Sequence, residues 1–202
     1  MALRDFDPDT LAFYAHEARD YAANGFTGIG RHLDGFLDRL APGATILELG
    51  CGAGRDAEAM AARGFHVDAT DGVPEMAALA SARLGRPVRV LRFDQLEAVE
   101  AYDGVVAAYS LLHVPRAGLP GVLRRVWRAL RPGGWHIAIY KTAGAEGRDR
   151  LGRYYNYPDE AQLRGFYAAA GPWSEIGTES GEGRGYEGAA ARFVSITLRK
   201  PD

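Results

Sequence analysis

The sequence predicts an α/β fold: a doubly wound, mostly parallel sheet of seven strands, with a C-terminal antiparallel strand and helices on both faces. Three observations predict this fold. Short apolar runs alternate with segments of helical periodicity along the 202 residues, a pattern typical of parallel strands joined by helices in right-handed crossovers. A glycine-rich loop follows the first strand-like run. The last two runs have no helix between them, so they are expected to pair as an antiparallel hairpin.

Composition and charge narrow the class of protein. The chain is 47% hydrophobic and 25% charged with a net charge of −2, so we expect one domain over residues 1–202 that binds no nucleic acid. Cys51 is the single cysteine, which excludes an internal disulfide and favours a reducing compartment. No apolar run approaches the ~20 residues of a membrane helix, and the amino terminus lacks a secretion-signal pattern. We therefore expect a cytoplasmic protein without a membrane partner, as a monomer or weak homodimer.

Residues 1–40 predict two helices. Apolar residues recur at helical spacing in the first helix: Leu11, Tyr14, Ala15, Ala18, Tyr21 and Ala22. Thr27 is a candidate cap for the second helix. The buried face of that second helix would carry Ile29, Leu33, Phe36, Leu37 and Leu40. Ala41-Pro42-Gly43 is expected to end it.

The remaining elements alternate along the chain. Strands are expected at residues 45–49, 65–70, 88–93, 103–109, 135–140, 173–180 and 192–199. Helices are expected at residues 56–63, 74–84 and 119–130, with a fourth that Pro158 opens. Pro74 suits a first helical turn and Gly85 a helix end, while residues 131–134 are expected to stop the helix before them. The polar, glycine-rich segment 142–153 has no periodicity and predicts a mobile loop.

The loop after the first strand carries the clearest chemical signal. Gly50, Gly52 and Gly54 let the backbone turn tightly and approach a ligand, and the helix that follows directs free N–H groups at the loop. Asp71 ends the second strand, where a carboxylate can accept from both hydroxyls of a ribose. Asp94 ends the third strand, where it could accept from a base amine. Taken alone, a glycine loop is more often a tight turn, and each aspartate is more often a helix cap or turn residue. Their occurrence at three consecutive strand ends favours a nucleotide-type ligand.

At these residues the sequence resembles the class I S-adenosylmethionine-dependent methyltransferases, over nearly the whole chain. The resemblance lies in the terminal hairpin and in five stretches: Ile46-Leu47-Glu48-Leu49-Gly50-Cys51-Gly52-Ala53-Gly54-Arg55-Asp56, Asp71-Gly72-Val73-Pro74-Glu75-Met76, Phe93-Asp94-Gln95-Leu96, Tyr102-Asp103 to His113, and Leu130-Arg131-Pro132-Gly133-Gly134. It implies S-adenosyl-L-methionine as the cofactor. It also implies that the cofactor is bound by Tyr14, Tyr21, Glu48, Gly50, Cys51, Gly52, Gly54, Arg55, Asp71, Gly72, Met76, Asp94, Gln95 and Tyr109. One departure is Gly72-Val73, where many relatives have a polar residue before the proline.

Some of these residues have a second interpretation. Tyr14 and Tyr21 lie seven apart on one helical face, so they could cover the cofactor as part of a helical lid over residues 1–40, or they could be ordinary core aromatics. Glu48 could accept hydrogen bonds from the ammonium group of the cofactor or from loop amides. Arg55 could meet the carboxylate of the cofactor or face solvent.

The resemblance implies methyl transfer to an oxygen or nitrogen of a small molecule. His113, just beyond the fourth strand, is the candidate general base for a hydroxyl or a protonated amine, or else a structural histidine bonded to loop backbone. Cys51 invites a nucleophile role, but its place inside the loop favours a small packing residue. Residues 141–157 are the expected acceptor-site loop, because their arginines and tyrosines could grip an anionic or aromatic molecule; equally, the tyrosines could pack on the sheet. The histidines show no metal-ligand spacing.

Two other functions stay open. A small NAD(P)-dependent oxidoreductase would use a similar strand–loop–helix unit, but Gly50, Gly52 and Gly54 form G-x-G-x-G and not the G-x-G-x-x-G of the dinucleotide fingerprint. A non-catalytic cofactor-binding protein would keep the loop and the acids without the transfer reaction. Binding of S-adenosylmethionine or of a nicotinamide nucleotide distinguishes a methyltransferase from an oxidoreductase.

Overall fold

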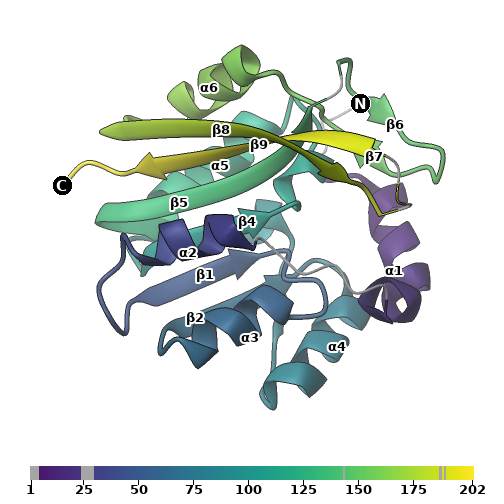
Figure 1. The fold of residues 1–202 in the computed structure, drawn as a ribbon, viewed down its shortest axis with the longest axis horizontal. Helices are drawn as coiled ribbons and strands as arrows, with labels where there is room; N and C mark the ends of the chain where they lie inside the picture. Colours follow the sequence, from purple (N-terminus) through teal and green to yellow (C-terminus); the bar gives the residue numbers. More distant parts are fainter. Residues whose placement is uncertain (1–4, 24–29, 143, 187, 189) are drawn as a thin grey trace.

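A seven-stranded sheet forms the centre of the computed structural model, which describes residues 5–23, 30–142, 144–186, 188 and 190–202 (Figure 1). The strand order is β3-β2-β1-β4-β5-β9-β8. The bounds are Thr45–Leu49 (β1), His66–Asp71 (β2), Arg89–Val90 (β3), Tyr102–Ala108 (β4), Leu130–Thr142 (β5), Glu175–Arg184 (β8) and Ala190–Arg199 (β9). Strands β1 to β5 pair in parallel, and β9 is antiparallel to both β5 and β8. The predicted fold class is confirmed.

Helices cover both faces of this sheet (Figure 1). They are α1 (Pro8–Ala23), α2 (Arg31–Leu37), α3 (Arg55–Ala62), α4 (Pro74–Leu84), α5 (Leu119–Ala129) and α6 (Glu160–Ala168). Two short 3₁₀ turns, η1 (Phe93–Gln95) and η2 (Leu111–His113), follow β3 and β4. A separate small hairpin pairs β6 (Gly147–Arg148) with β7 (Tyr154–Tyr155).

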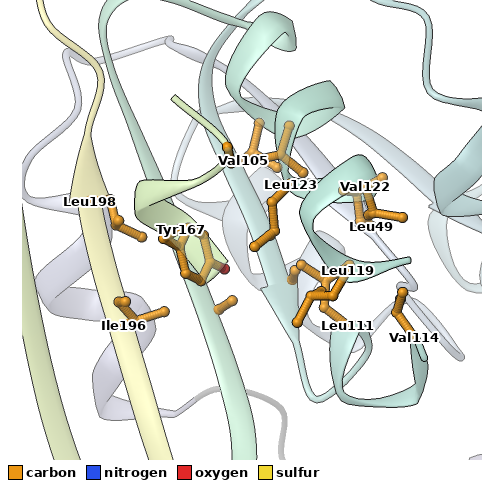
Figure 2. Close-up of a cluster of buried hydrophobic side chains, with 14 of the residues drawn as sticks. Leu49, Val105, Leu111, Val114, Leu119, Val122, Leu123, Tyr167, Ile196 and Leu198 are labelled. Carbon is orange, nitrogen blue, oxygen red and sulfur yellow. The ribbon is translucent and has the colours of Figure 1, made fainter. Parts of the chain in front are cut away.

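The strand side chains alternate between two hydrophobic cores, as the pleat of a strand requires. On the face covered by α5 and α6 the buried cluster includes Leu47, Val105, Leu119, Leu123, Tyr167 and Ile196 (Figure 2). On the face covered by α2, α3 and α4 it includes Phe36, Ile46, Met60, Ala80 and Val106. Ile46 and Leu47 are neighbours in β1 and serve opposite cores. Because both faces are covered, the strand ends carry the residues that remain available for a ligand.

Several predicted strand boundaries differ from the structure. The hairpin strands expected at 173–180 and 192–199 are β8 over Glu175–Arg184 and β9 over Ala190–Arg199, so the hairpin runs further toward its tip. The strand expected at 88–93 pairs only at Arg89–Val90, because η1 follows it, so Asp94 lies on a 3₁₀ turn. The strand expected from residue 135 begins at Leu130, which pairs with Tyr102 directly after α5. The register then shifts, so the residues between Leu130 and Trp135 form an irregularity inside β5 and not a loop before it.

Three other elements were missed or only partly described by the sequence. The segment predicted as an unstructured loop contains the hairpin β6–β7, whose two-residue strands are too short to show periodicity. Helix α6 begins two residues after Pro158, because Asp159 caps it: its carboxylate accepts from the Gln162 N–H at 2.7 Å, and the Gln162 side chain accepts from the Asp159 N–H at 3.1 Å. The candidate cap Thr27 and its neighbour Ile29 lie outside the described residues.

Candidate functional site

The candidate site lies at the carboxyl ends of the parallel strands, where open α/β sheets bind ligands. Two adjoining cavities of about 220 and 110 Å³ are found there. Residues of helix α1 line both cavities, and residues 184–186 at the tip of the β8–β9 hairpin line the larger one. Figure 1 shows α1 beside the β8–β9 hairpin. Both cavities are lined by Tyr14, Tyr21, Gly50, Gly52, Ala108, Tyr109 and His113. Together the two volumes fall at the lower end of the ~300–1,000 Å³ range of ligand sites.

The glycine loop is packed against the sheet at Gly50 and borders the cavities at Gly52. Gly50 and Gly52 have φ angles of 73° and 53°, a region that other residues rarely adopt. The Gly50 N–H donates to the Thr70 carbonyl at 2.9 Å. A Cβ atom at Gly50 would lie 2.5 Å from the Cβ of Ser110, whereas one at Gly52 would meet only the Tyr21 ring, at 3.9 Å. Packing therefore requires the first glycine, and the second leaves the backbone exposed to the cavities.

Glu48 places a buried carboxyl group at the larger cavity. The residue is 2% exposed, and among the described residues its Oε2 atom has no hydrogen-bond partner. Burial, together with the nearby Asp56 and Asp71 carboxylates, raises the pKa of Glu48 well above its usual range. A buried polar atom without a partner costs about 1–3 kcal/mol, so a ligand that donates a hydrogen bond here would relieve that cost.

Asp71 ends β2 at the smaller cavity. Its Oδ2 atom accepts from the Gly52 N–H at 2.8 Å, and its Oδ1 atom accepts from the Val73 N–H at 2.9 Å. Burial raises the pKa of Asp71 to about 6, although these N–H bonds favour the charged form. Each carboxylate oxygen has a second lone pair, so Asp71 can also accept from hydroxyl groups in the cavity.

His113 and Tyr14 join the exit loop of β4 to helix α1. The Nδ1 atom of His113 lies 2.6 Å from the Tyr154 carbonyl oxygen, so Nδ1 carries the proton and donates it. The Nε2 atom is then the acceptor of the Tyr14 hydroxyl, at 2.9 Å. Burial lowers the pKa of His113 to about 3, so the ring is neutral near pH 7. A single acceptor nitrogen therefore faces both cavities, and Tyr14 covers it.

Arg153 is a buried cation at the larger cavity that the sequence placed in the acceptor-site loop without distinguishing it from its neighbours. The residue is 2% exposed. Its Nε and Nη2 atoms donate to the Asp149 carboxylate at 2.9 and 2.7 Å, and its Nη1 atom lies 3.3 Å from the Tyr14 hydroxyl. The guanidinium carbon lies 5.0 to 5.8 Å from the ring centroids of Phe13, Tyr14, Tyr155 and Tyr186. In the sequence, only the density of arginine and tyrosine in residues 141–157 indicated this cluster of rings around Arg153.

Aromatic rings form the other walls. Tyr21 of α1 stacks on Tyr186 of the hairpin tip, with ring centroids 5.1 Å apart. Tyr109 has a φ of 54°. Its ring and that of Phe193 pack in a T-shaped arrangement, with ring centroids 5.3 Å apart. A positive φ in a residue with a bulky side chain is strained, and such strain clusters at ligand sites. The hairpin tip is thus part of the site, although its glycines predicted only a turn.

Most of the residues predicted to bind the cofactor gather at these cavities. Those that line at least one of them are Tyr14, Tyr21, Glu48, Gly50, Cys51, Gly52, Arg55, Asp71, Gly72, Met76 and Tyr109. Burial raises the pKa of the Cys51 thiol, which opposes a thiolate nucleophile and agrees with the packing interpretation. Arg55 donates to the Ala22 carbonyl at 2.5 Å, so it ties α3 to the end of α1. The cofactor roles of these residues stay predictions.

Three of the predicted residues line neither cavity: Gly54, Asp94 and Gln95. Gly54 precedes α3 with a φ of 79°, and a Cβ atom there would lie 3.1 Å from Ala80, so its place is explained by helix packing. Asp94 is paired with Arg92 at 3.0 Å, and the Gln95 side chain accepts from the Arg92 backbone N–H at 3.1 Å. Arg92 itself lines the smaller cavity.

Comparison with known proteins points to methyltransferases. Residues 46–134 match a protein-family model described as a methyltransferase domain. The chain is 36% identical over 160 residues to the ubiquinone biosynthesis O-methyltransferase of Paramagnetospirillum magneticum, a match that covers 76% of this chain and 60% of the relative. Both matches support a class I methyltransferase. The resemblance predicted from the sequence motifs is therefore confirmed.

Solved structures of similar fold extend this methyltransferase comparison. The 1,6-didemethyltoxoflavin-N1-methyltransferase of Burkholderia thailandensis has a TM-score of 0.75 and 22% identity, over 96% of this chain and 87% of that chain. The cyclase SpnF has a TM-score of 0.73 and 18% identity, over 100% of this chain and 98% of that chain. Identity this low shows the fold alone, which hosts more than one chemistry. The chain spans 60% of the length of the Paramagnetospirillum relative, so its own activity is inferred from its site.

Over the described ranges, no helix of this chain combines the length and the apolar character needed to cross a bilayer. The same ranges hold no cluster of three or more histidine, cysteine, aspartate or glutamate side chains arranged to hold a metal ion.

Proposed function

We propose that this protein transfers a methyl group from S-adenosyl-L-methionine to an oxygen or nitrogen atom of a small molecule. One observation carries the proposal: Glu48, whose Oε2 atom has no hydrogen-bond partner among the described residues, lines one pair of adjoining cavities together with Gly52 and the carboxylate of Asp71. The match of residues 46–134 to a methyltransferase domain supports it. So does the similarity to an O-methyltransferase in sequence and to an N-methyltransferase in fold.

The residues present fit this cofactor. Asp71 would accept from ribose hydroxyls, and the free Oε2 atom of Glu48 would accept from the ammonium group. The rings of Tyr14, Tyr21 and Tyr109 would lie near the sulfonium, which aromatic faces attract. When bound, the cofactor supplies a methyl group on a positively charged sulfur, and transfer breaks that S–C bond while the acceptor forms a new bond to carbon.

His113 would then orient the acceptor. Its bond to the Tyr154 carbonyl fixes the ring, and its Nε2 atom would exchange the Tyr14 hydroxyl for the hydroxyl or amine of the acceptor. Because burial keeps the pKa of His113 near 3, the ring is neutral over the working pH range and is a weak base. The proton of the acceptor would move to Nε2 only as the new bond to carbon makes that proton acidic.

The same proposal gives roles to the rest of the chain. Residues 1–40 would act as a lid, because α1 lies against both cavities, and residues 141–157 would contact the acceptor, because Lys141, Arg153 and Tyr155 line the larger one. We propose a single domain that handles a small-molecule acceptor and no nucleic acid. The location in the cytoplasm and the monomer or weak homodimer stay predictions from composition.

Thermal-shift measurements with S-adenosylmethionine, S-adenosylhomocysteine, NAD and NADP test the cofactor. The first two should raise the unfolding temperature, since ligands that bind only the folded state stabilise it. Asp71→Asn should remove most of that shift, whereas Asp38→Asn, an exposed residue after α2, should keep it. Stabilisation by a nicotinamide nucleotide alone would favour the oxidoreductase. Release of S-adenosylhomocysteine over a metabolite panel then tests transfer, and binding without any product would favour a non-catalytic protein.

A further inference from the structure

The acceptor side of the larger cavity combines cationic side chains with aromatic faces. Four cationic residues line that cavity: Arg55, Lys141, Arg153 and Arg184. They outnumber the two acidic lining residues, Glu48 and Asp56, and burial favours the neutral form of Glu48. A neighbouring cavity of about 430 Å³ shares Lys141, Arg153 and Tyr186 with the first and adds Arg192 and Asp149. The electrostatic balance of this side of the site therefore favours a negatively charged molecule.

Arg153 is the cation that burial desolvates most completely. Two of its nitrogen atoms are held by Asp149 at 2.9 and 2.7 Å, which keeps the charge compensated and the side chain fixed. Among the described residues, the only hydrogen-bond partner of its third nitrogen, Nη1, is the Tyr14 hydroxyl. The N···O distance is 3.3 Å, which is long for an N–H···O bond. The edge of the guanidinium that faces Tyr14 is thus weakly paired, and a carboxylate would pair with it more strongly.

The Tyr14 hydroxyl bridges two groups that an acceptor needs. It donates to the Nε2 atom of His113 at 2.9 Å and accepts from the Nη1 atom of Arg153 at 3.3 Å. The two nitrogen atoms therefore lie within about 6 Å of one another, each at hydrogen-bond range of the same oxygen. A small molecule with an acidic group at one end and a hydroxyl at the other could satisfy both nitrogen atoms at once. The rings of Tyr14, Tyr155 and Tyr186, which surround the guanidinium, would pack on a planar molecule.

We propose that Arg153 determines acceptor specificity, and that the acceptor is an aromatic acid bearing a hydroxyl group. The carboxylate would pair with Nη1 of Arg153 in place of the Tyr14 hydroxyl, and the hydroxyl of the acceptor would donate to Nε2 of His113. In the transfer step the O–H proton passes to Nε2, the oxygen forms the bond to the methyl carbon, and the S–C bond breaks with its electron pair staying on sulfur. This inference rests on the proposed function and names its substrate class.

Three matched probes test this inference: a dihydroxybenzoate, its neutral methyl ester and the cationic dihydroxybenzylamine. Each is titrated by calorimetry into the full chain saturated with S-adenosylhomocysteine. The benzoate should bind at least tenfold more tightly than the ester, and the amine should bind most weakly. The comparison of acid and ester uses the wild-type protein, so it does not depend on the folding of any variant.

A double variant locates the effect at Arg153. Arg153→Gln combined with Asp149→Asn removes both charges together and leaves no unpaired buried ion. It should bring the benzoate to within about twofold of the ester when both are titrated at saturating S-adenosylhomocysteine. Arg164→Gln is the control, because Arg164 pairs with Glu160 on the surface of α6, and it should keep the full preference for the acid.

The outcomes separate this inference from the proposed function. If the wild-type chain does not bind S-adenosylhomocysteine, the proposed function fails and takes the inference with it. If S-adenosylhomocysteine binds but the benzoate binds no better than the ester, or not at all, the proposed function stands and the acid-acceptor inference is wrong. Retention of the tenfold preference in a folded double variant would overturn the assignment of Arg153.

Discussion

Gly50→Ala tests the packing that holds the cofactor loop against the sheet. At this position the backbone has a φ of 73°, and an added Cβ atom would lie 2.5 Å from the Cβ of Ser110 and 3.2 Å from its Oγ. Ser110 has little freedom to move, because its hydroxyl donates to the Leu49 carbonyl at 2.6 Å inside the sheet. The substitution should therefore add both backbone strain and a steric clash.

Gly43→Ala separates the two effects. Gly43 has a φ of 74°, and a Cβ atom there would meet nothing within 4 Å. Left-handed backbone costs an alanine about 1–2 kcal/mol, and overpacking adds about 1–3 kcal/mol. We expect Gly43→Ala to lower the free energy of unfolding by ~1–2 kcal/mol and Gly50→Ala by ~2–5 kcal/mol.

Urea unfolding without ligand measures this difference through the shift of the midpoint at a shared m value. Gly52→Ala adds a third arm: its φ is 53° but its Cβ would meet only the Tyr21 ring at 3.9 Å. It should destabilise the fold no more than Gly43→Ala does, and weaken binding of S-adenosylhomocysteine. Equal destabilisation by Gly50→Ala and Gly43→Ala would refute the claim that Ser110 holds the loop.

Three further predictions concern a buried hydroxyl group, a helix cap and the ionisation of Asp71. Tyr167→Phe should cost about 1–3 kcal/mol of unfolding free energy, because the Tyr167 hydroxyl bonds buried His136 at 2.8 Å and buried Tyr140 at 3.1 Å; an unchanged urea midpoint would contradict that role. Asp159→Ala should cost about 0.5–2 kcal/mol, since it removes the capping box of α6. Asp38→Ala, at the exposed C-cap of α2, where the cap bonds come from the backbone, should cost less in the same assay. Because the pKa of Asp71 is raised to about 6, its ionisation opposes folding: its contribution favours stability below its unfolded value, near 4, and that contribution is lost as the pH rises through 6. Ligand binding should follow the opposite trend, because ribose hydroxyls need the carboxylate, so calorimetric affinity for S-adenosylhomocysteine should fall as the pH is lowered through about 6. Asp71→Asn should abolish this titration, and a wild-type affinity that does not change between pH 5 and 7.5 would exclude Asp71 from the site.

Much of the sheet could be predicted because buried parallel strands are short continuous apolar runs. The runs at β1, β4 and β5 are of this kind, and each supplies both cores. The shortness of β3 could not be read in the same way, since Arg89 and Val90 are exposed and the strand ends in a 3₁₀ turn. The start of β5 at Leu130 was hidden by Pro132, Gly133 and Gly134, which are typical of loops but here lie where the register of β5 shifts.

The cofactor half of the site was predictable because it depends on local order along the chain. Glu48, Gly50, Gly52 and Asp71 lie at strand ends that the topology brings together. The acceptor half depends on contacts between distant segments. Arg153 is buried because the hairpin β6–β7 brings it against helix α1 and residue 186 of the β8–β9 tip, and no periodicity in the sequence records that arrangement.

The central claim is that the cofactor occupies the two adjoining cavities, between Glu48 and Asp71. A crystal structure of the chain with S-adenosylhomocysteine tests this claim. We expect the ribose hydroxyls to lie within hydrogen-bond distance of the Asp71 carboxylate and the amino group to contact the Oε2 atom of Glu48. Binding of S-adenosylhomocysteine elsewhere on the molecule, or its failure to bind where NADP does, would contradict the claim.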